Sequence, residues 1–228
     1  QNIGVFCIGD NLKAAKVAAD LTETNARVIS SVEETSKYKF ISKKDIFDVE
    51  YWSLEQAKIK KETKELAGNV VVITGAFGKI GTATYKLFKK YGAEVVLIDN
   101  NWKKITEMNK KINDLCIYCD VTNKESVKKA FNLISSQFGG IDILISNAGT
   151  ALGGPIAEVD DKILRKSFED NFFSHQNCAA EATKIMKTQN IEGCLLFNIS
   201  KQAVNPGKNF GPYGLPKSAL LNLCKQYA

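Results

Sequence analysis

The chain of 228 residues is poor in the side chains on which metal and nucleic-acid sites depend. Its single histidine, His175, cannot build a multi-histidine metal site, no Ser–His–Asp motif surrounds it, and we expect it to be structural. The formal net charge is only +6, and the lysines are scattered along amphipathic stretches instead of forming a dense basic tract. No apolar run is long enough to span a bilayer, and no signal peptide is visible. We therefore expect no metal, no nucleic-acid partner and no membrane partner.

The six cysteines lie mostly in apolar stretches, which is typical of buried thiols in a reducing cytosol and predicts a cytoplasmic protein. Cys116 and Cys119 have the CxxC spacing of zinc and redox sites. They fall inside an expected strand, however, and no second pair or histidine follows nearby. The sequence therefore predicts core positions for both.

Two segments with different content make up the chain. It begins at Gln1 without a Met and ends at Ala228 inside an amphipathic pattern, so we expect a piece of a longer protein. Residues 1–66 are predicted to be a small α/β segment without a visible site. Its expected elements are strands Ile3–Ile8 and Ala26–Val32, a helix Leu12–Leu21, a helix from Asp45 that includes Tyr51, Trp52, Leu54 and Ala57, and a linker or solvated helix end from Lys58 to Lys64.

Residues 67–228 alternate strand and helix patterns, which predicts an α/β fold of the Rossmann type, with a doubly wound parallel sheet. The first apolar run is short enough that a buried helix also fits it. A long helix is expected over Asp160–Lys187, and the last helix is expected to open near Tyr213. The expected strands are Val70–Ile73, Glu94–Ile98, Leu115–Cys119, Ile141–Ser146 and Gly193–Ile199.

A glycine-rich turn follows the first of these strands and precedes a helix. Such a turn points free backbone N–H groups at an anion, and its glycines let a pyrophosphate approach. Asp99, at the end of the next strand, is placed to hold two ribose hydroxyls. The pattern indicates dinucleotide binding, and the alternative is a tight turn that binds nothing. Further polar residues, Asp120, Asn147 and Ser200, end later strands, where open α/β sheets bind ligands.

Tyr213 and Lys217 are four residues apart and so share a helix face. Pro216 between them predicts that this is the first helical turn. An ammonium near a phenol favours the phenolate, so Tyr213 could act as a general acid or base. Ser200, thirteen positions earlier, could hydrogen-bond a substrate oxygen. A Tyr–x–x–x–Lys spacing also occurs by chance on amphipathic helices.

From about Asn69 onward the chain resembles the short-chain dehydrogenase/reductase family. The turn Thr74–Gly81 resembles the family's TGxxxGxG, and Asp120–Val121 and Asn147–Ala148–Gly149 match its adenine-contacting pair and NAG motif. Asn171, Ser200, Tyr213 and Lys217 match its catalytic tetrad. The resemblance implies that Tyr213 exchanges a proton with the substrate oxygen, Lys217 binds the nicotinamide ribose, Ser200 orients the substrate and Asn171 holds a water in a proton relay. The cofactor-binding residues it implies are Thr74, Gly75, Phe77, Gly78, Lys79, Ile80, Gly81, Asp99, Asp120, Val121, Asn147, Ala148, Gly149, Tyr213 and Lys217.

The sequence departs from the family pattern at the turn and at the end. The family's middle glycine is Lys79 here, with Gly78 one place earlier, and Lys79 could reach a phosphate. Asp99 would repel a 2′-phosphate and Asn100 and Asn101, not arginine, follow it, so NAD is expected over NADP. The chain also ends before the family's last helix and strands, which predicts a C-terminally incomplete domain.

A narrower resemblance covers both segments. The stretches Phe47–Lys58 and Asn205–Lys217 are similar to bifunctional proteins that fuse a class II aldolase of the rhamnulose-phosphate type to a short-chain dehydrogenase. On this basis residues 1–66 are the tail of the aldolase half, whose zinc-binding histidines would lie upstream, and no aldolase activity is expected.

The leading hypothesis is an NAD-dependent oxidoreductase that transfers a hydride between the cofactor and a small alcohol, aldehyde or sugar-derived substrate. The alternatives are a non-catalytic nucleotide-binding regulatory or scaffold domain and an inactive fragment of an aldolase/dehydrogenase fusion. A homo-oligomer is plausible, because the family often associates through helices that correspond to Asp160–Lys187 and Tyr213 onward.

Overall fold

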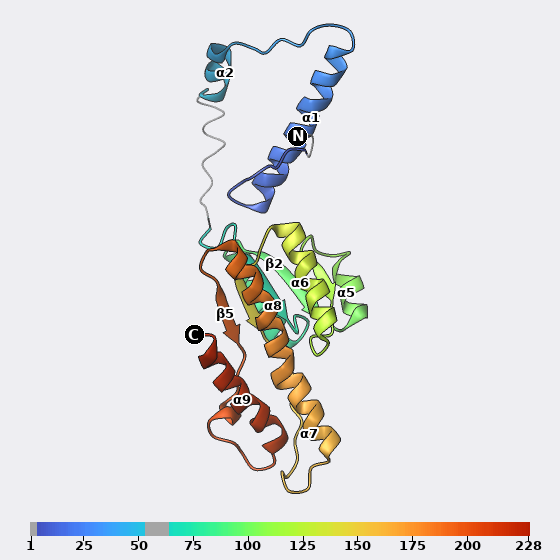
Figure 1. Cartoon of the computed structure of the whole chain (residues 1–228), viewed down its shortest axis with the longest axis vertical. Coiled ribbons are helices and arrows are strands. Elements are labelled where there is room, and N and C mark those ends of the chain that lie inside the picture. Colours follow the sequence, from blue (N-terminus) through green and yellow to red (C-terminus); the bar gives the residue numbers. More distant parts are fainter. Residues whose placement is uncertain (1–3, 53–63) are drawn as a thin grey trace. The chain divides into compact units, whose positions relative to one another are not determined.

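The computed structural model describes residues 4–52 and 64–228. The chain divides into two compact units, Gln1–Gly68 and Asn69–Ala228, which are described separately (Figure 1).

A five-stranded parallel sheet forms the centre of the second unit, in the order β3-β2-β1-β4-β5. Its order reverses beside β1, which pairs with β2 on one side and β4 on the other, so the carboxyl ends of β1 and β4 flank a topological switch point. The strands are β1 Val70–Thr74, β2 Glu94–Asp99, β3 Cys116–Tyr118, β4 Ile143–Ser146 and β5 Cys194–Phe197.

Strand β1 is buried along its whole length, with Val71, Val72 and Ile73 at 0% exposure, because helices cover both faces of a doubly wound sheet. The short apolar run is therefore a central strand and not a buried helix. One face of the sheet packs against Phe131 of α6 and Ala179 of α8, and Figure 1 shows both helices lying across it.

The helices of this unit begin and end where the sequence supplies caps. Asn123 caps α6 by accepting a hydrogen bond from the Ser126 amide, and Gly139 ends the same helix with φ of 81°. The long helix expected over Asp160–Lys187 is present as a continuous helical segment that consists of α7, a π-helical turn and α8. The elements are α4 Lys79–Lys90, α5 Trp102–Met108, α6 Lys124–Phe138, α7 Asp161–Phe168, η1 Glu169–Phe173, α8 Ser174–Gln189, η2 Lys201–Ala203 and α9 Gly211–Gln226.

The expected position of Pro216 in a first helical turn is wrong. Helix α9 already begins at Gly211, with Pro212 in its first turn, so Pro216 falls in the second turn. Its missing N–H leaves the Pro212 carbonyl without its usual helical partner, and the helix nevertheless continues past the buried Pro216 to Gln226.

The expected strands in the first unit are also wrong, because its described residues contain helices and no strand. Helix α1 runs from Leu12 to Glu33 and includes Ala26–Val32, since no glycine or proline interrupts it after the Asn11 cap. Within the described part of the chain, residues 4–8 have no strand beside them with which to pair, and Ile3 lies outside that part. Helix α2 covers Lys43–Glu50 and stops before Tyr51 and Trp52; Leu54, Ala57 and most of the Lys58–Lys64 stretch lie outside the described residues.

Candidate active site

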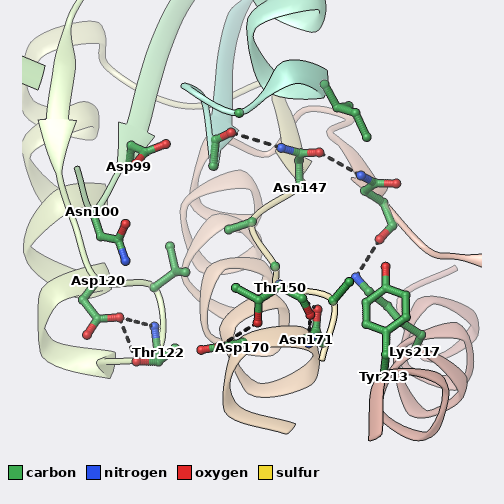
Figure 2. Close-up of a pocket in the computed structure, with 18 of the residues that line it drawn as sticks. Asp99, Asn100, Asp120, Thr122, Asn147, Thr150, Asp170, Asn171, Tyr213 and Lys217 are labelled. Carbon is green, nitrogen blue, oxygen red and sulfur yellow. Dashed lines mark hydrogen bonds between the residues drawn. The ribbon is translucent and has the colours of Figure 1, made fainter. Parts of the chain in front are cut away.

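A cavity of about 550 Å³ opens at the carboxyl ends of the strands in the second unit. Figure 2 shows Asp99, Asn100 and Asp120 at one end of it, Tyr213 and Lys217 at the other, and Asn147 and Thr150 between them. The cavity thus lies along the switch point of the sheet, where doubly wound folds bind nucleotides.

The glycine turn between β1 and α4 forms one wall. Gly75 has φ of +61°, which favours glycine, and a Cβ atom there would come within 2.8 Å of the Ala148 Cα atom. Gly81 lies in the first turn of α4, where a Cβ atom would come within 2.8 Å of the Ala76 Cα atom. Both glycines therefore serve close backbone packing, which brings the N-terminus of α4 and its unpaired N–H groups to the cavity.

The Asp99 carboxylate is held in place by two backbone amides. Its Oδ2 accepts a hydrogen bond from the Phe77 amide at 3.0 Å, and its Oδ1 accepts one from the Asn101 amide at 3.0 Å. Because each carboxylate oxygen has two lone pairs, both can still accept from a ligand hydroxyl. The contact to Phe77 ties the end of β2 to the glycine turn.

Asn147 joins the ends of three strands. Its Nδ2 donates to the carbonyl oxygens of Thr74 at 3.1 Å and Gly75 at 3.2 Å, and its Oδ1 accepts from Asn198 Nδ2 at 2.8 Å. Thr74 Oγ1 in turn accepts from the amides of Asn147 at 2.9 Å and Ala148 at 3.1 Å. These hydrogen bonds hold the backbone at the floor of the cavity in place.

Asn171 lies in the π-helical turn between α7 and α8 and is completely buried. Its Nδ2 donates to the Thr150 carbonyl at 2.8 Å and to Ser167, while its Oδ1 accepts from the Thr150 amide at 3.2 Å. The neighbouring Asp170 accepts a hydrogen bond from Thr150 Oγ1 at 2.8 Å and pairs with Lys166. The loop after β4 is thus fastened to this helix.

Lys217 is 3% exposed, and its ammonium lies 5.8 Å from the centre of the Tyr213 ring. Its Nζ donates to the Asn198 carbonyl at 2.9 Å and lies 3.2 Å from His175 Nε2. Burial lowers the pKa of Lys217 to about 8, because an ammonium loses hydration there. Burial and the charge of Lys217 together lower the pKa of His175 to about 3, so its imidazole is neutral at pH 7.

The structure brings most of the expected site residues to this cavity, but not all of them. Thr74 and Gly81 are buried beneath the turn, Phe77 contributes its amide to Asp99, and Ser200 caps the short helix η2 by accepting from the Gln202 amide at 3.2 Å. None of these four lines the cavity. Those that line it are Gly75, Gly78, Lys79, Ile80, Asp99, Asp120, Val121, Asn147, Ala148, Gly149, Asn171, Tyr213 and Lys217.

Several lining residues escaped the sequence interpretation. Asn100, Thr150 and Asp170 each lie next to an expected site residue in the chain, which is the signal that could have found them. The cavity lining further includes Cys119, Thr122, Ala151, Lys166 and Asn198. His175 lies one helical turn after Asn171, but nothing in the sequence connects it to Lys217.

Among residues 4–52 and 64–228 no group of three or more His, Cys, Asp or Glu side chains could hold a metal ion. In these same ranges no helix combines the length and apolarity needed to cross a membrane.

Comparison with known proteins shows which families the two segments resemble. Residues 69–228 match the family model described as short chain dehydrogenase, and residues 1–59 match the one described as aldolase class II, second domain. The uncharacterized oxidoreductase YuxG of Bacillus subtilis (strain 168) is 30% identical over 98% of this chain, which spans 34% of that protein.

Two solved structures share the fold of the second unit. The NADPH-dependent 3-quinuclidinone reductase of Rhodotorula rubra has a TM-score of 0.63 and 29% identity, covering 71% of this chain and 64% of its own. NAD⁺-bound xylitol dehydrogenase has a TM-score of 0.67 and 26% identity, covering 74% and 65%. Because the short chain dehydrogenase model matches more than half of the chain, the chain belongs to the short-chain dehydrogenase family of oxidoreductases, which bind nicotinamide cofactors, and the match to the aldolase class II model lies ahead of that domain.

Proposed function

We propose that residues 69–228 catalyse NAD-dependent hydride transfer to or from a small alcohol, aldehyde or sugar-derived substrate. The observation that carries this proposal is the placement of Tyr213 and Lys217, 5.8 Å from ring centre to ammonium, on the cavity that begins at the glycine turn. The proposed proton-transfer group, Tyr213, and the proposed dinucleotide-binding turn therefore line the same cavity.

The cavity residues suit a dinucleotide. The unpaired amides at the start of α4 and the side chain of Lys79 provide a positive wall for the pyrophosphate, and the oriented Asp99 carboxylate provides acceptors for ribose hydroxyls. When bound, the nicotinamide ring supplies the hydride chemistry.

Each proposed catalytic residue has a distinct task. Tyr213 passes the proton of its hydroxyl to the substrate oxygen or takes it back, and the nearby Lys217 ammonium is assigned to the nicotinamide ribose. Ser200 Oγ accepts from the Gln202 amide and keeps its O–H as a donor, so we assign that O–H to the substrate oxygen although Ser200 lies outside the cavity lining. Asn171 Oδ1 keeps a second lone pair after binding the Thr150 amide, and we assign it to a water of the proton relay.

The preference for NAD rests on Asp99. Its negative charge would repel a 2′-phosphate, and the neighbouring Asn100 on the cavity wall is neutral. The solved relatives include both an NADPH-dependent and an NAD⁺-bound enzyme, so the local charge is the better guide. A polyol or sugar-derived substrate agrees with the similarity to xylitol dehydrogenase.

The test follows NADH formation with a panel of small alcohols and polyols, and NADH consumption with the matching aldehydes and ketones. The Tyr213→Phe variant should lose turnover while still binding cofactor. Tyr91→Phe serves as a matched control, because Tyr91 ends α4 away from the cavity lining. Turnover retained in Tyr213→Phe would refute its role. Cofactor binding without turnover on any substrate would instead favour a regulatory domain or an inactive fragment.

The aldolase-like segment and self-association extend the proposal to the full-length protein. Residues 1–66 would then be the end of an aldolase domain, and dimers or tetramers would form through α7–α8 and α9. Sedimentation of the chain tests the second point, since a monomer at all concentrations would contradict it.

A further inference from the structure

A buried chain of polar side chains runs behind the catalytic lysine. Ser146 Oγ lies 2.7 Å from His175 Nδ1, and His175 Nε2 lies 3.2 Å from Lys217 Nζ. The three side chains come from β4, α8 and α9, and their residues are 1%, 1% and 3% exposed. Burying three polar side chains together costs free energy unless each of them is hydrogen-bonded, so their contacts with one another matter.

The chemistry of Lys217 fixes the state of the imidazole. A charged ammonium has three N–H donors and no acceptor, so His175 Nε2 must be the acceptor in their contact. The single proton of the neutral ring then resides on Nδ1 and points at Ser146 Oγ. This is the opposite of the tautomer that a free histidine side chain favours in water.

The same contact restricts where Lys217 can reach. One N–H is taken by the Asn198 carbonyl at 2.9 Å and a second by His175 Nε2. The third is left for the cavity that Tyr213 also lines. At the other end of this row of side chains, Ser146 is buried, so its hydroxyl cannot pass a proton directly to solvent.

We propose that His175 is a positioning residue for Lys217, held as the neutral Nδ1–H tautomer by Ser146 and by the ammonium it binds. This proposal rests on the proposed function for its catalytic consequence, but not for its structural content. The charged group that faces His175 is Lys217 from α9, whereas β4 contributes the Ser146 hydroxyl and β5 the Phe197 ring.

The tautomer can be read directly, because the chain contains one histidine. Histidine labelled with ¹⁵N gives one imidazole spin system in a long-range ¹H–¹⁵N correlation spectrum of the full chain. At pH 7 we expect Nδ1 protonated and Nε2 unprotonated. In Lys217→Met, which removes the donor, Ser146 can donate to Nδ1 and the proton should move to Nε2. A wild-type ring with the proton on Nε2, or with both nitrogens protonated, would overturn the proposal whether or not the protein is active.

Two substitutions then separate the two ends of the ring. A glutamine amide reaches the place of Nε2 and can still accept from Lys217, whereas an asparagine amide reaches only the place of Nδ1 and faces Ser146. His175→Asn should therefore lower kcat about tenfold with little change in KM, and His175→Gln should retain most of it. Circular dichroism and cofactor titration show whether both variants fold. Equal kcat values in two folded variants would show that His175 only fills space.

Discussion

The side-chain amide of Asn147 donates to the Thr74 carbonyl at 3.1 Å and so ties the end of β4 to the end of β1. The same amide also binds the Gly75 carbonyl. We expect Asn147→Ala to lower the free energy of unfolding by about 2 kcal/mol, because two carbonyls at the cavity floor lose their donor. Urea denaturation measures the change. Asn147→Asp should destabilise the protein further, because its carboxylate would face the same carbonyl oxygens. An unchanged urea midpoint in both variants would show that Asn147 does not hold the ends of β1 and β4 together.

The two glycines that flank the start of α4 should respond differently to alanine. At Gly81 a Cβ atom would meet Ala76 at 2.8 Å, so Gly81→Ala should destabilise the cofactor-free protein by about 1–3 kcal/mol. Gly78 has φ of −73° and a Cβ atom there would meet only the Gly75 oxygen, at 3.4 Å. Gly78→Ala should therefore leave the thermal midpoint nearly unchanged. It should weaken NAD binding, because Gly78 lines the cavity and the added methyl group would occupy part of it. Equal melting temperatures for the two variants would show that α4 does not depend on this close approach.

Asp99 should set the ratio of NAD to NADP use. We expect Asp99→Asn to lower kcat/KM for NAD and raise it for NADP, because the amide keeps an acceptor oxygen but loses the charge that repels a 2′-phosphate. Adding Asn100→Arg should strengthen the change, since the guanidinium can pair with the phosphate. Initial rates with both cofactors measure the ratio, and an unchanged ratio in the double variant would place cofactor selection elsewhere.

His175 should make stability depend on pH in the acid range. Its pKa falls from the usual 6.5 to about 3 in the folded chain, so between these values only the unfolded chain takes up the proton. Stability is therefore lost as the pH falls below 6.5. Between pH 6.5 and 4 this loss is about 3 kcal/mol. Glutamine at position 175 does not titrate. The unfolding free energy of the wild type minus that of His175→Gln should therefore fall by about 3 kcal/mol from pH 7 to pH 4. Lys217, with its pKa near 8, titrates outside this window. Parallel pH curves for the two proteins would contradict the prediction.

The second unit should fold and bind cofactor without the first. Helices α1 and α2 contain no buried residue, and all cavity-lining residues belong to Asn69–Ala228. A chain of residues 69–228 should therefore keep the thermal midpoint and the NAD affinity of the full chain. A large loss of either would show that Gln1–Gly68 supports the cavity.

The sheet and the position of the glycine turn could be predicted because their signals are local. The buried run Val70–Ile73, the glycines after it and Asp99 lie within one strand–helix–strand unit, and the structure confirms the strand. Strand Ala26–Val32 was a wrong prediction for the opposite reason. Its β-branched residues favour a strand, but a strand needs a neighbour to pair with. The helix capped by Asn11 meets no glycine or proline and continues through this segment.

The roles of side chains were harder to predict, because they depend on contacts between residues distant in the sequence. His175 and Lys217 are 42 positions apart, so a lone histidine gives no sign of its partner. Ser200 is adjacent to the last short helix and binds its own chain, a local contact that the strand-end pattern does not show. The twice-bound carboxylate of Asp99 likewise depends on a turn geometry that composition does not reveal.

The spread of the cavity along the chain has a consequence during synthesis. Its lining begins at Gly75 and is complete only with Lys217, which lies on α9. A nascent chain that has already formed β1 to β4 on the ribosome would still lack the wall that carries Tyr213. Ligand binding can therefore stabilise this unit only after the segment that carries Tyr213 and Lys217 has been synthesised and folded. Until then the partly formed sheet must depend on its own packing or on chaperones.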